Sequence, residues 1–326
     1  MRAPAFWDAG VASAWPALLA PLAALYDAAG RLRRAMATPV RLPVPVVCVG
    51  NLVAGGAGKT PAVIALLRHL KQKGRKPHVV TRGYGGSMAG PVAVGFAHTA
   101  ADVGDEALLL AAEATVWVAR DRAAGGQAAV AAGADCVLLD DGFQNPSLHQ
   151  DVRLLVIDQA SGLGNGRVIP AGPLRETPEA GFLRAHAVIA LRGEGERIQK
   201  LPVPPGLPVF TARLAPGIAL ADIAGARVVA FAGIGRPAKF FATLRAIGCE
   251  VVAEHAFPDH HAFDADVVMR LVDEAKALNA RLVTTAKDAV RLPESARALI
   301  DVLPVHLLFD DAAAADALLS RVLQHG

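Results

Sequence analysis

The stretch VCVGNLVAGGAGKTPAVIALLRHL, Val47 to Leu70, places four glycines, a lysine and a threonine between a valine-rich run and a leucine-rich run. The first run predicts a buried strand over residues 44–49, and the second predicts a helix over residues 61–73. Glycines permit backbone angles that side chains forbid, so the amide groups of this loop can close on a phosphate. The start of the helix adds a second anion site. The order strand, glycine loop, helix therefore indicates a site for a nucleotide phosphate.

The residues of this loop have distinct expected roles. Lys59 would reach the β- and γ-phosphates of ATP, and the Thr60 hydroxyl would bind Mg²⁺. One position departs from the standard G-x-x-x-x-G-K-[ST] pattern, because Val53 stands where a glycine is expected. The alternative is a glycine turn that binds nothing, but the strand–GGAGKT–helix context favours ATP. The residues expected to hold ATP are Ala54, Gly55, Gly56, Ala57, Gly58, Lys59 and Thr60.

The rest of the chain predicts an α/β protein. Of its 326 residues, 53% are hydrophobic but only 5% are aromatic, which suits buried parallel strands covered by alanine-rich helices. Strand-length apolar runs alternate with helical patterns, as in β-α-β units. Strands are predicted over residues 44–49, 78–81, 115–119, 136–139, 154–157, 187–191, 209–212, 227–232, 250–255, 282–285 and 305–308. Helices are predicted over residues 61–73, 105–114, 122–132, 238–247, 266–278 and 312–323.

A proline-rich segment, LPVPPGLPVF at residues 201–210, interrupts this alternation. Because proline disrupts helices and central strands, we expect a hinge between two domains here. Residues 1–205 would form a P-loop NTPase-like domain with a mostly parallel sheet. Residues 206–326 would form a second, smaller α/β domain.

Charge and cysteine content exclude some function classes. The formal net charge of +3 is too small to argue for a nucleic-acid partner. Cys48, Cys136 and Cys249 lie far apart, each in an apolar run and without C-x-x-C spacing. A zinc site or a disulfide framework is therefore not expected, and a reducing, cytosolic setting fits best.

The N-terminal segment combines aromatic and apolar residues with a basic flank. The apolar part between Asp8 and Asp27 is short and holds Pro16 and Pro21, so it makes a poor membrane-spanning helix. Two readings stay open: a helix that lies on an anionic membrane surface, or a helix that packs on the protein's own core. The residues in question are Phe6, Trp7, Trp15, Leu18, Leu19, Leu22, Leu25 and Tyr26, followed by Arg31, Arg33, Arg34 and Arg41.

Three further motifs follow predicted strands. In ADCVLLDDGFQ, Asp140 and Asp141 come directly after four apolar residues. Ligands of open α/β sheets bind beyond the carboxyl ends of strands, so these carboxylates are candidates for Mg²⁺. A solvated turn is the alternative. Arg82 and Tyr84 in TRGYGG, and Arg122 in ARDR, could face phosphate oxygens, although surface charge is an equally good explanation for each arginine.

Other nucleotide-binding classes fit less well. A guanine-nucleotide switch protein usually carries N-K-x-D, and the nearest match, TTAKDAV at residues 284–290, lacks the asparagine. A dinucleotide-binding loop, G-x-G-x-x-G, has no lysine where GGAGKT has one. A phosphate-loop regulatory or assembly ATPase acting on a protein partner stays open as the alternative. Such an ATPase would need no base for a hydroxyl acceptor.

The chain resembles the tetraacyldisaccharide 4′-kinase family, the lipid A 4′-kinases of Gram-negative bacteria. Eight motifs carry the resemblance in the family's order: GNLVAGGAGKTP, TRGYGG, VGDEALLLA, VLLDDGFQ, IPAGPLRE, FAGIGRP, FPDHHAF and TTAKDAVRL. It implies transfer of the γ-phosphoryl group of ATP to the 4′-hydroxyl of a lipid A disaccharide precursor. It also implies a place at the cytoplasmic face of the inner membrane, which would explain the N-terminal segment. No obligate protein partner is implied.

The resemblance also assigns roles to residues whose local pattern is ambiguous. Asp105 follows VG at a helix start, where an acid is ordinarily stabilised by the helix dipole; the resemblance makes it the catalytic base. His260 of FPDHHAF would assist it, with His261 as second choice. Gln144 and Glu176 would lie near the nucleotide and metal. Lys287 and Asp288 match a family motif, but neither residue has an assigned role in the reaction. We expect them to form an internal ion pair.

Overall fold

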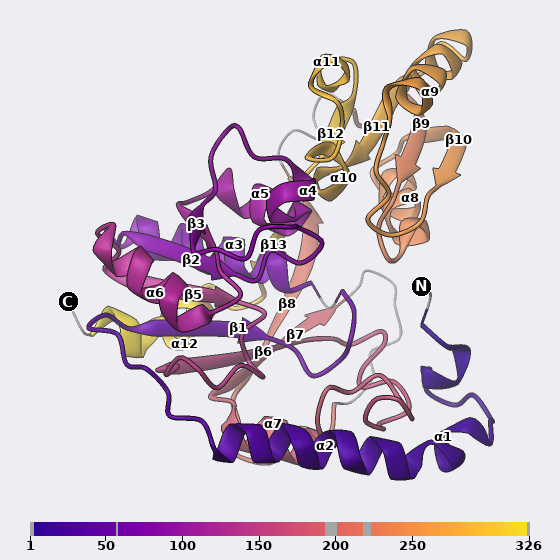
Figure 1. Cartoon of the computed structure of the whole chain (residues 1–326). Coiled ribbons are helices and arrows are strands. Elements are labelled where there is room, and N and C mark those ends of the chain that lie inside the picture. Colours follow the sequence, from indigo (N-terminus) through magenta and orange to yellow (C-terminus); the bar gives the residue numbers. More distant parts are fainter. Residues whose placement is uncertain (1–2, 57, 193–200, 218–222, 325–326) are drawn as a thin grey trace.

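The computed structural model describes residues 3–56, 58–192, 201–217 and 223–324. Within them, the strands form one large and one small sheet (Figure 1). The nine strands of the large sheet follow the order β13-β8-β7-β6-β1-β5-β2-β4-β3. They are β1 (Val46–Gly50), β2 (Pro77–Thr81), β3 (Val92–Ala93), β4 (Val116–Val118), β5 (Cys136–Asp140), β6 (Val152–Asp158), β7 (Ala187–Arg192), β8 (Val209–Pro216) and β13 (Val305–Phe309).

The small sheet is wholly parallel, in the order β10-β9-β11-β12. Its strands are β9 (Arg227–Ala232), β10 (Glu250–Ala256), β11 (Arg281–Thr285) and β12 (Asp301–Leu303). The helices are η1 (Ala5–Trp7), α1 (Trp15–Leu18), α2 (Ala20–Ala35), α3 (Lys59–Gln72), α4 (Ala100–Val103), α5 (Asp105–Ala111), α6 (Arg122–Ala131), α7 (Pro178–Arg184), α8 (Pro237–Ala246), α9 (Ala265–Ala277), α10 (Ala286–Ala289), α11 (Glu294–Arg297) and α12 (Ala314–Leu323). No described helix is long and apolar enough to cross a membrane.

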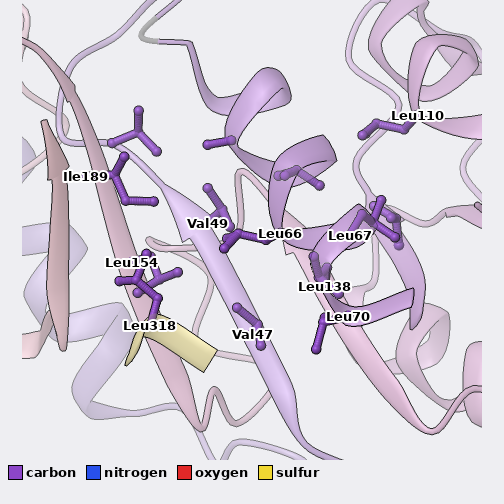
Figure 2. Close-up of a cluster of buried hydrophobic side chains, with 14 of the residues drawn as sticks. Val47, Val49, Leu66, Leu67, Leu70, Leu110, Leu138, Leu154, Ile189 and Leu318 are labelled. Atoms are coloured by element: carbon purple, nitrogen blue, oxygen red, sulfur yellow. The ribbon is translucent and has the colours of Figure 1, made fainter. Parts of the chain in front are cut away.

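Strand β1 explains why its sequence is a continuous apolar run. It lies between β5 and β6, parallel to both, and both of its faces are buried. Successive side chains of a strand point to opposite faces. Val47 and Val49 pack with the leucines of α3 in one core cluster (Figure 2), whereas Val46 and Cys48 belong to the cluster on the other face. The phosphate loop is thus attached to the best-buried part of the molecule.

The predicted α/β fold with a mostly parallel sheet is confirmed, and every strand and helix predicted from the sequence is present with small shifts at its ends. The predicted boundary after residue 205 differs from the division between the sheets. Strand β8 pairs in parallel with β7, β13 pairs antiparallel with β8, and α12 packs on the same sheet. The small sheet therefore takes only residues from β9 to β12. The two-domain organisation stays a prediction, with these ranges corrected.

The chain passes between the two sheets after β8 and again at Pro304. At this double crossing, Gly217 N donates a hydrogen bond to Pro304 O at 2.8 Å. A Cβ on Gly217 would lie 2.6 Å from His306 Nε2, so the crossing is tightly packed. We therefore expect the hinge at this crossing and not in the proline-rich segment, because the residues after that segment continue the large sheet.

Core packing predicts how two leucine substitutions differ. Leu67 of α3 is fully buried, whereas Leu183 of α7 is 87% exposed. Replacing a buried leucine with alanine leaves a cavity, so Leu67→Ala should lower the free energy of unfolding by about 2–5 kcal/mol. Leu183→Ala, also in a helix, should change it by less than about 0.5 kcal/mol. Urea unfolding followed by circular dichroism measures both, and equal losses would contradict the assigned packing.

Candidate active site

The phosphate loop joins β1 to α3, and glycines are required at both of its ends. A Cβ on Gly50 would lie 2.5 Å from Phe143 Cβ, and one on Gly58 would lie 2.3 Å from Leu191 Cδ1. Gly58 also has a φ of 75°, in the left-handed region, as the residue before α3. No side chain caps α3, so its first backbone N–H groups are available to an anion. Ala57, expected in the loop, lies outside the described residues.

The loop is held in a way that accounts for its departure from the standard pattern. Val53 forms an isolated bridge with Leu174, and Ala54 N donates to Pro173 O at 2.7 Å. Asn51, which is fully buried, donates from Nδ2 to Val53 O at 2.7 Å. The backbone at Val53 is therefore extended and paired, so it does not need a glycine. Sequence analysis did not identify Asn51, although a polar residue inside an apolar run was a usable signal.

Asp141 follows β5 and faces two cations. Arg175 donates to both of its oxygens, from Nη1 at 2.7 Å and from Nη2 at 3.0 Å, and Lys59 Nζ lies 3.7 Å from Oδ1. Burial opposes ionisation, but the charges of Lys59 and Arg175 outweigh it and hold the pKa of Asp141 below its ordinary value. Asp141 is therefore a carboxylate beside the phosphate-loop lysine. Arg175 belongs to the IPAGPLRE motif, but the sequence analysis did not assign it to the site.

Asp140 is the other carboxylate at this strand end, and its environment is different. It is 1% exposed, it accepts a hydrogen bond from Thr81 Oγ1 at 3.4 Å, and its Oδ1 has no partner among the described residues. Burial, followed by the charges of Glu106 and Asp141, raises the pKa of Asp140 from 3.8 to about 7. An unpartnered buried carboxylate oxygen fits a divalent cation, whose charge would offset these effects.

Gln144 and Glu176 form a second layer behind the aspartates. Gln144 Nε2 donates to Asn51 O at 2.9 Å and to Glu176 Oε1 at 3.0 Å. Glu176, 1% exposed, accepts two hydrogen bonds from Arg184, at 2.8 and 3.0 Å. Arg34 of α2 lies 3.6 Å from the same carboxylate. These contacts tie the phosphate loop, the residues after β5 and the N-terminal helix into one network.

Asp105 and His260 meet at the boundary between the two sheets. Asp105, 3% exposed, begins α5, and His260 lies in the loop after β10. His260 Nδ1 lies 2.8 Å from Asp105 Oδ2. Burial is the largest influence on the Asp105 pKa and raises it, but the His260 hydrogen bond and the charges of Lys287 and Arg291 outweigh burial and leave it lowered. Asp105 is thus ionised at neutral pH, so His260 Nδ1 carries the donated proton.

Lys287 and Glu106 connect this pair to the aspartates of β5. Lys287 Nζ lies 3.5 Å from Glu106 Oε1, 4.0 Å from Asp105 Oδ2 and 3.9 Å from Asp259 Oδ1. The Glu106 charge is also among the causes that raise the Asp140 pKa, so Glu106 acts on Asp140 as well as pairing with Lys287. The expected ion pair of Lys287 is present, but its partners lie in the candidate site. Sequence analysis missed this because the partners are far apart in the chain.

The remaining predicted residues take different positions. Tyr84 is 67% exposed, with its ring centroid 5.7 Å from that of His260. Arg122 is buried; burial lowers its pKa while the charges of Asp140 and Asp141 oppose that shift, so it lies near the aspartates. Arg82 is exposed.

His261 stacks on Phe257 at 4.8 Å between ring centroids and packs against Phe263. The structure therefore brings His260, and not the second choice His261, to Asp105.

Thr60 is 8% exposed at the start of α3, where its hydroxyl follows Lys59. Within the described part of the chain, no group of three His, Cys, Asp or Glu side chains is arranged to hold a metal ion. Thr60, Asp140 and Asp141 would therefore hold Mg²⁺ only together with phosphate oxygens and water, which is the usual way Mg²⁺ binds beside a nucleotide.

Comparison with known proteins identifies relatives along the whole chain. Residues 15–324 match the family described as tetraacyldisaccharide-1-P 4′-kinase. A tetraacyldisaccharide 4′-kinase of Rhodospirillum rubrum is 51% identical over 328 residues, which cover 99% of this chain and 98% of that protein. A tetraacyldisaccharide 4′-kinase of Rhodospirillum centenum is 53% identical and covers 99% of this chain and 97% of that protein.

A solved structure agrees with these relatives. The crystal structure of LpxK from Aquifex aeolicus in complex with ATP superposes with a TM-score of 0.79. Its sequence is 26% identical, and the match covers 94% of this chain and 99% of that chain. This chain therefore shares its fold with the Aquifex aeolicus protein, and that protein's complex with ATP supports the use of ATP by this chain.

The raised pKa of Asp140 predicts a conflict between stability and function. Folding raises this pKa from 3.8 to about 7, so the folded state holds an extra proton between these values. Stability of the ligand-free protein due to this group therefore falls as pH rises from about 4 to about 7. Asp140→Asn removes the ionisation and should raise the melting temperature at pH 8 by several degrees.

Thermal unfolding of the wild type and variant at pH 5 and pH 8 measures this effect. The control is Asp273→Asn, because the Asp273 side chain is 71% exposed and its substitution should leave the pH dependence unchanged. A melting temperature for Asp140→Asn below that of the wild type at pH 8 would show that the ionised carboxylate stabilises the fold.

Proposed function

The chain belongs to the tetraacyldisaccharide-1-P 4′-kinase family, and we propose that the site around Asp105 and Lys59 carries out this family's reaction. The chain is a lipid A 4′-kinase: it phosphorylates the 4′-hydroxyl of tetraacyldisaccharide 1-phosphate with ATP. We further propose roles for individual residues, the use of Mg²⁺ and a contact with the membrane.

The contact between His260 Nδ1 and Asp105 Oδ2, at 2.8 Å, is the observation that carries the proposal. A phosphate loop serves many nucleotide-binding proteins, but an ionised carboxylate oriented by a histidine is what a hydroxyl acceptor requires. A regulatory ATPase, the alternative considered from the sequence, needs no such base. The family membership also does not favour it.

ATP would lie against the start of α3. The loop amides and Lys59 would bind its β- and γ-phosphates, and Mg²⁺, held by Thr60 and the two aspartates of β5, would neutralise charge that develops during transfer. Lys59 and Arg175 both pair with Asp141. Phosphate oxygens compete for these two cations, which would leave Asp141 free to face the metal.

Asp105 would accept the proton of the 4′-hydroxyl as the oxygen attacks the γ-phosphorus and the bond to the β,γ-bridging oxygen breaks, so that ADP leaves. The hydroxyl becomes more acidic as its bond to phosphorus forms, so a carboxylate with a low pKa can serve as the base. His260 Nδ1–H, donated to Oδ2, fixes the orientation of the carboxylate. Asp105 lies beside the large sheet and His260 beside the small sheet. The histidine can therefore orient the base only when the parts of the chain that carry the two sheets are in contact.

The N-terminal helices carry an apolar stripe that fits a membrane surface. At spacings of three and four residues, one face of α1 and α2 exposes large apolar side chains. These are Trp15 (56% exposed), Leu18 (68%), Leu22 (55%), Leu25 (68%), Leu32 (61%) and Met36 (75%). Arg33 and Arg41 are exposed beside them, whereas Arg34 turns inward to Glu176. This pattern supports peripheral binding to an anionic membrane, proposed as the cytoplasmic face of the inner membrane, where the acylated substrate resides.

The proposed base makes a direct prediction. Asp105→Asn should lower kcat by about 10²–10⁴-fold, because the amide cannot accept the hydroxyl proton, while ATP still binds. Transfer of label from [γ-³²P]ATP to the lipid acceptor measures this. The control is Asp266→Asn, an exposed acid in the first turn of α9 that should keep wild-type activity. Near-normal transfer by Asp105→Asn would remove it as the base.

The apolar stripe makes a separate prediction. Leu18→Gln combined with Leu25→Gln should weaken binding to vesicles of anionic phospholipid by at least about tenfold, because both side chains are expected to enter the bilayer interface. ATP affinity should stay unchanged. The matched control is Leu278→Gln combined with Leu299→Gln, because both leucines are exposed and lie beside the small sheet, away from the N-terminal helices. Vesicle binding equal to that of the wild type would place the membrane contact elsewhere.

A further inference from the structure

The carbonyl of Gly233, directly after β9, accepts two hydrogen bonds that converge on the proposed catalytic pair. His260 N donates to it at 3.1 Å, and Arg291 Nη2 donates to it at 2.9 Å. His260 has a φ of 60°, in the left-handed region that non-glycine residues adopt at some cost. A backbone in that state persists only when its surroundings fix it, and the Gly233 carbonyl is one of the groups that fix it.

Arg291 also faces the carboxylate itself. The side chain is 5% exposed, and its Nη1 lies 3.7 Å from Asp105 Oδ2. Nη1 and Nε have no hydrogen-bond partner within the described residues. A buried guanidinium with unused donors is costly unless those donors serve a partner. Nη1 needs to approach Asp105 by less than about 1 Å to donate a hydrogen bond to it.

Asp288 holds Arg291 in this position. It is fully buried and accepts hydrogen bonds from Gly233 N at 3.0 Å, from Thr285 Oγ1 at 2.5 Å and from Arg291 Nη2. Thr285 in turn accepts from Asp288 N, which fixes the first turn of α10. The Asp288 carboxylate thus ties the end of β9, the end of β11 and Arg291 together directly behind the His260 loop.

We propose that Arg291, held by Asp288, is a positioning residue for the catalytic pair: it fixes the His260 loop through the Gly233 carbonyl and presents a second cation to Asp105. This inference rests on the proposed function, in which Asp105 is the base. The groups that contact the Asp105 carboxylate are His260, Lys287 and Arg291. Two further carboxylates surround these partners: Asp259 pairs with His260 and Lys287, and Glu106 pairs with Lys287. The Arg291 variants retain the Lys287 charge beside Asp105, so their defect reports positioning more than total charge.

A double-mutant cycle with His260 tests the proposal. Arg291→Met should lower kcat by about 10–100-fold with little change in KM for ATP, and Arg291→Lys should recover part of that loss. In a His260→Ala background, Arg291→Met should change kcat by less than about threefold, because the loop that it positions no longer carries the histidine. Equal fold losses in both backgrounds would overturn the proposal, since they would show that Arg291 acts independently of the pair.

Two further variants keep the test independent of folding. Arg291→Met combined with Asp288→Asn removes both buried charges, so no carboxylate is left unpaired, and it should show the same dependence on His260. Arg281→Met is the control: its Nε pairs with Asp301 at 2.6 Å at the opposite end of β11, and its loss should leave kcat unchanged. If His260→Ala alone keeps wild-type kcat, the proposed base pair fails, and this inference fails with it. If His260→Ala is impaired but the cycle is additive, only the inference fails.

Discussion

The hydrogen bond between His260 and Asp105 joins the parts of the chain that carry the two sheets, together with the double crossing near Pro304, the contacts around α5 and α10, and the Arg236–Asp158 ion pair at 3.0 Å. Each sheet is mostly or wholly parallel, so each presents its loops at the carboxyl ends of its strands. The phosphate loop follows β1 and the two aspartates follow β5, whereas the His260 loop follows β10. The chemistry therefore depends on how one sheet edge faces the other. A change in that relation would separate the base from its histidine without disturbing either core.

Charge distribution in the site follows from the same arrangement. Carboxylates gather on the large unit, and cations reach them from the phosphate loop, from Arg175 and from the small unit. Asp141 and Asp105 each have close cationic partners and lowered pKa values. Asp140 has a raised pKa, and one of its oxygens has no hydrogen-bond partner in the part of the chain that the structure describes. Asp141 and Asp105 are thus neutralised by cations of the protein itself. The Asp140 carboxylate, with its raised pKa, is the one of the three that would gain most from a bound cation.

The sequence predicted the fold and much of the site because these depend on local pattern. The valines of β1 and the glycines after it specify a strand and a phosphate loop within a single window, and Asp140 is found at a strand end by the same reasoning. The pairing of Asp105 with His260 came from resemblance, since nothing in either local pattern joins residues 155 positions apart. Arg291 and the pairing of Glu106 with Lys287 were missed for that reason, because these contacts join different elements, whereas the local signal of Asn51 was overlooked. The place of β8 and β13 in the large sheet was missed because strand order depends on pairing between distant segments, which no local pattern specifies.

A crystal structure with Mg²⁺ and a non-hydrolysable ATP analogue tests the central claim most directly. The account predicts the γ-phosphate against Lys59 and the start of α3, the metal beside Asp140 and Asp141, and the Asp105 carboxylate facing the γ-phosphate while still bonded to His260. A nucleotide bound away from Lys59, or an Asp105 side chain turned from the phosphate with the two units in contact, would contradict it.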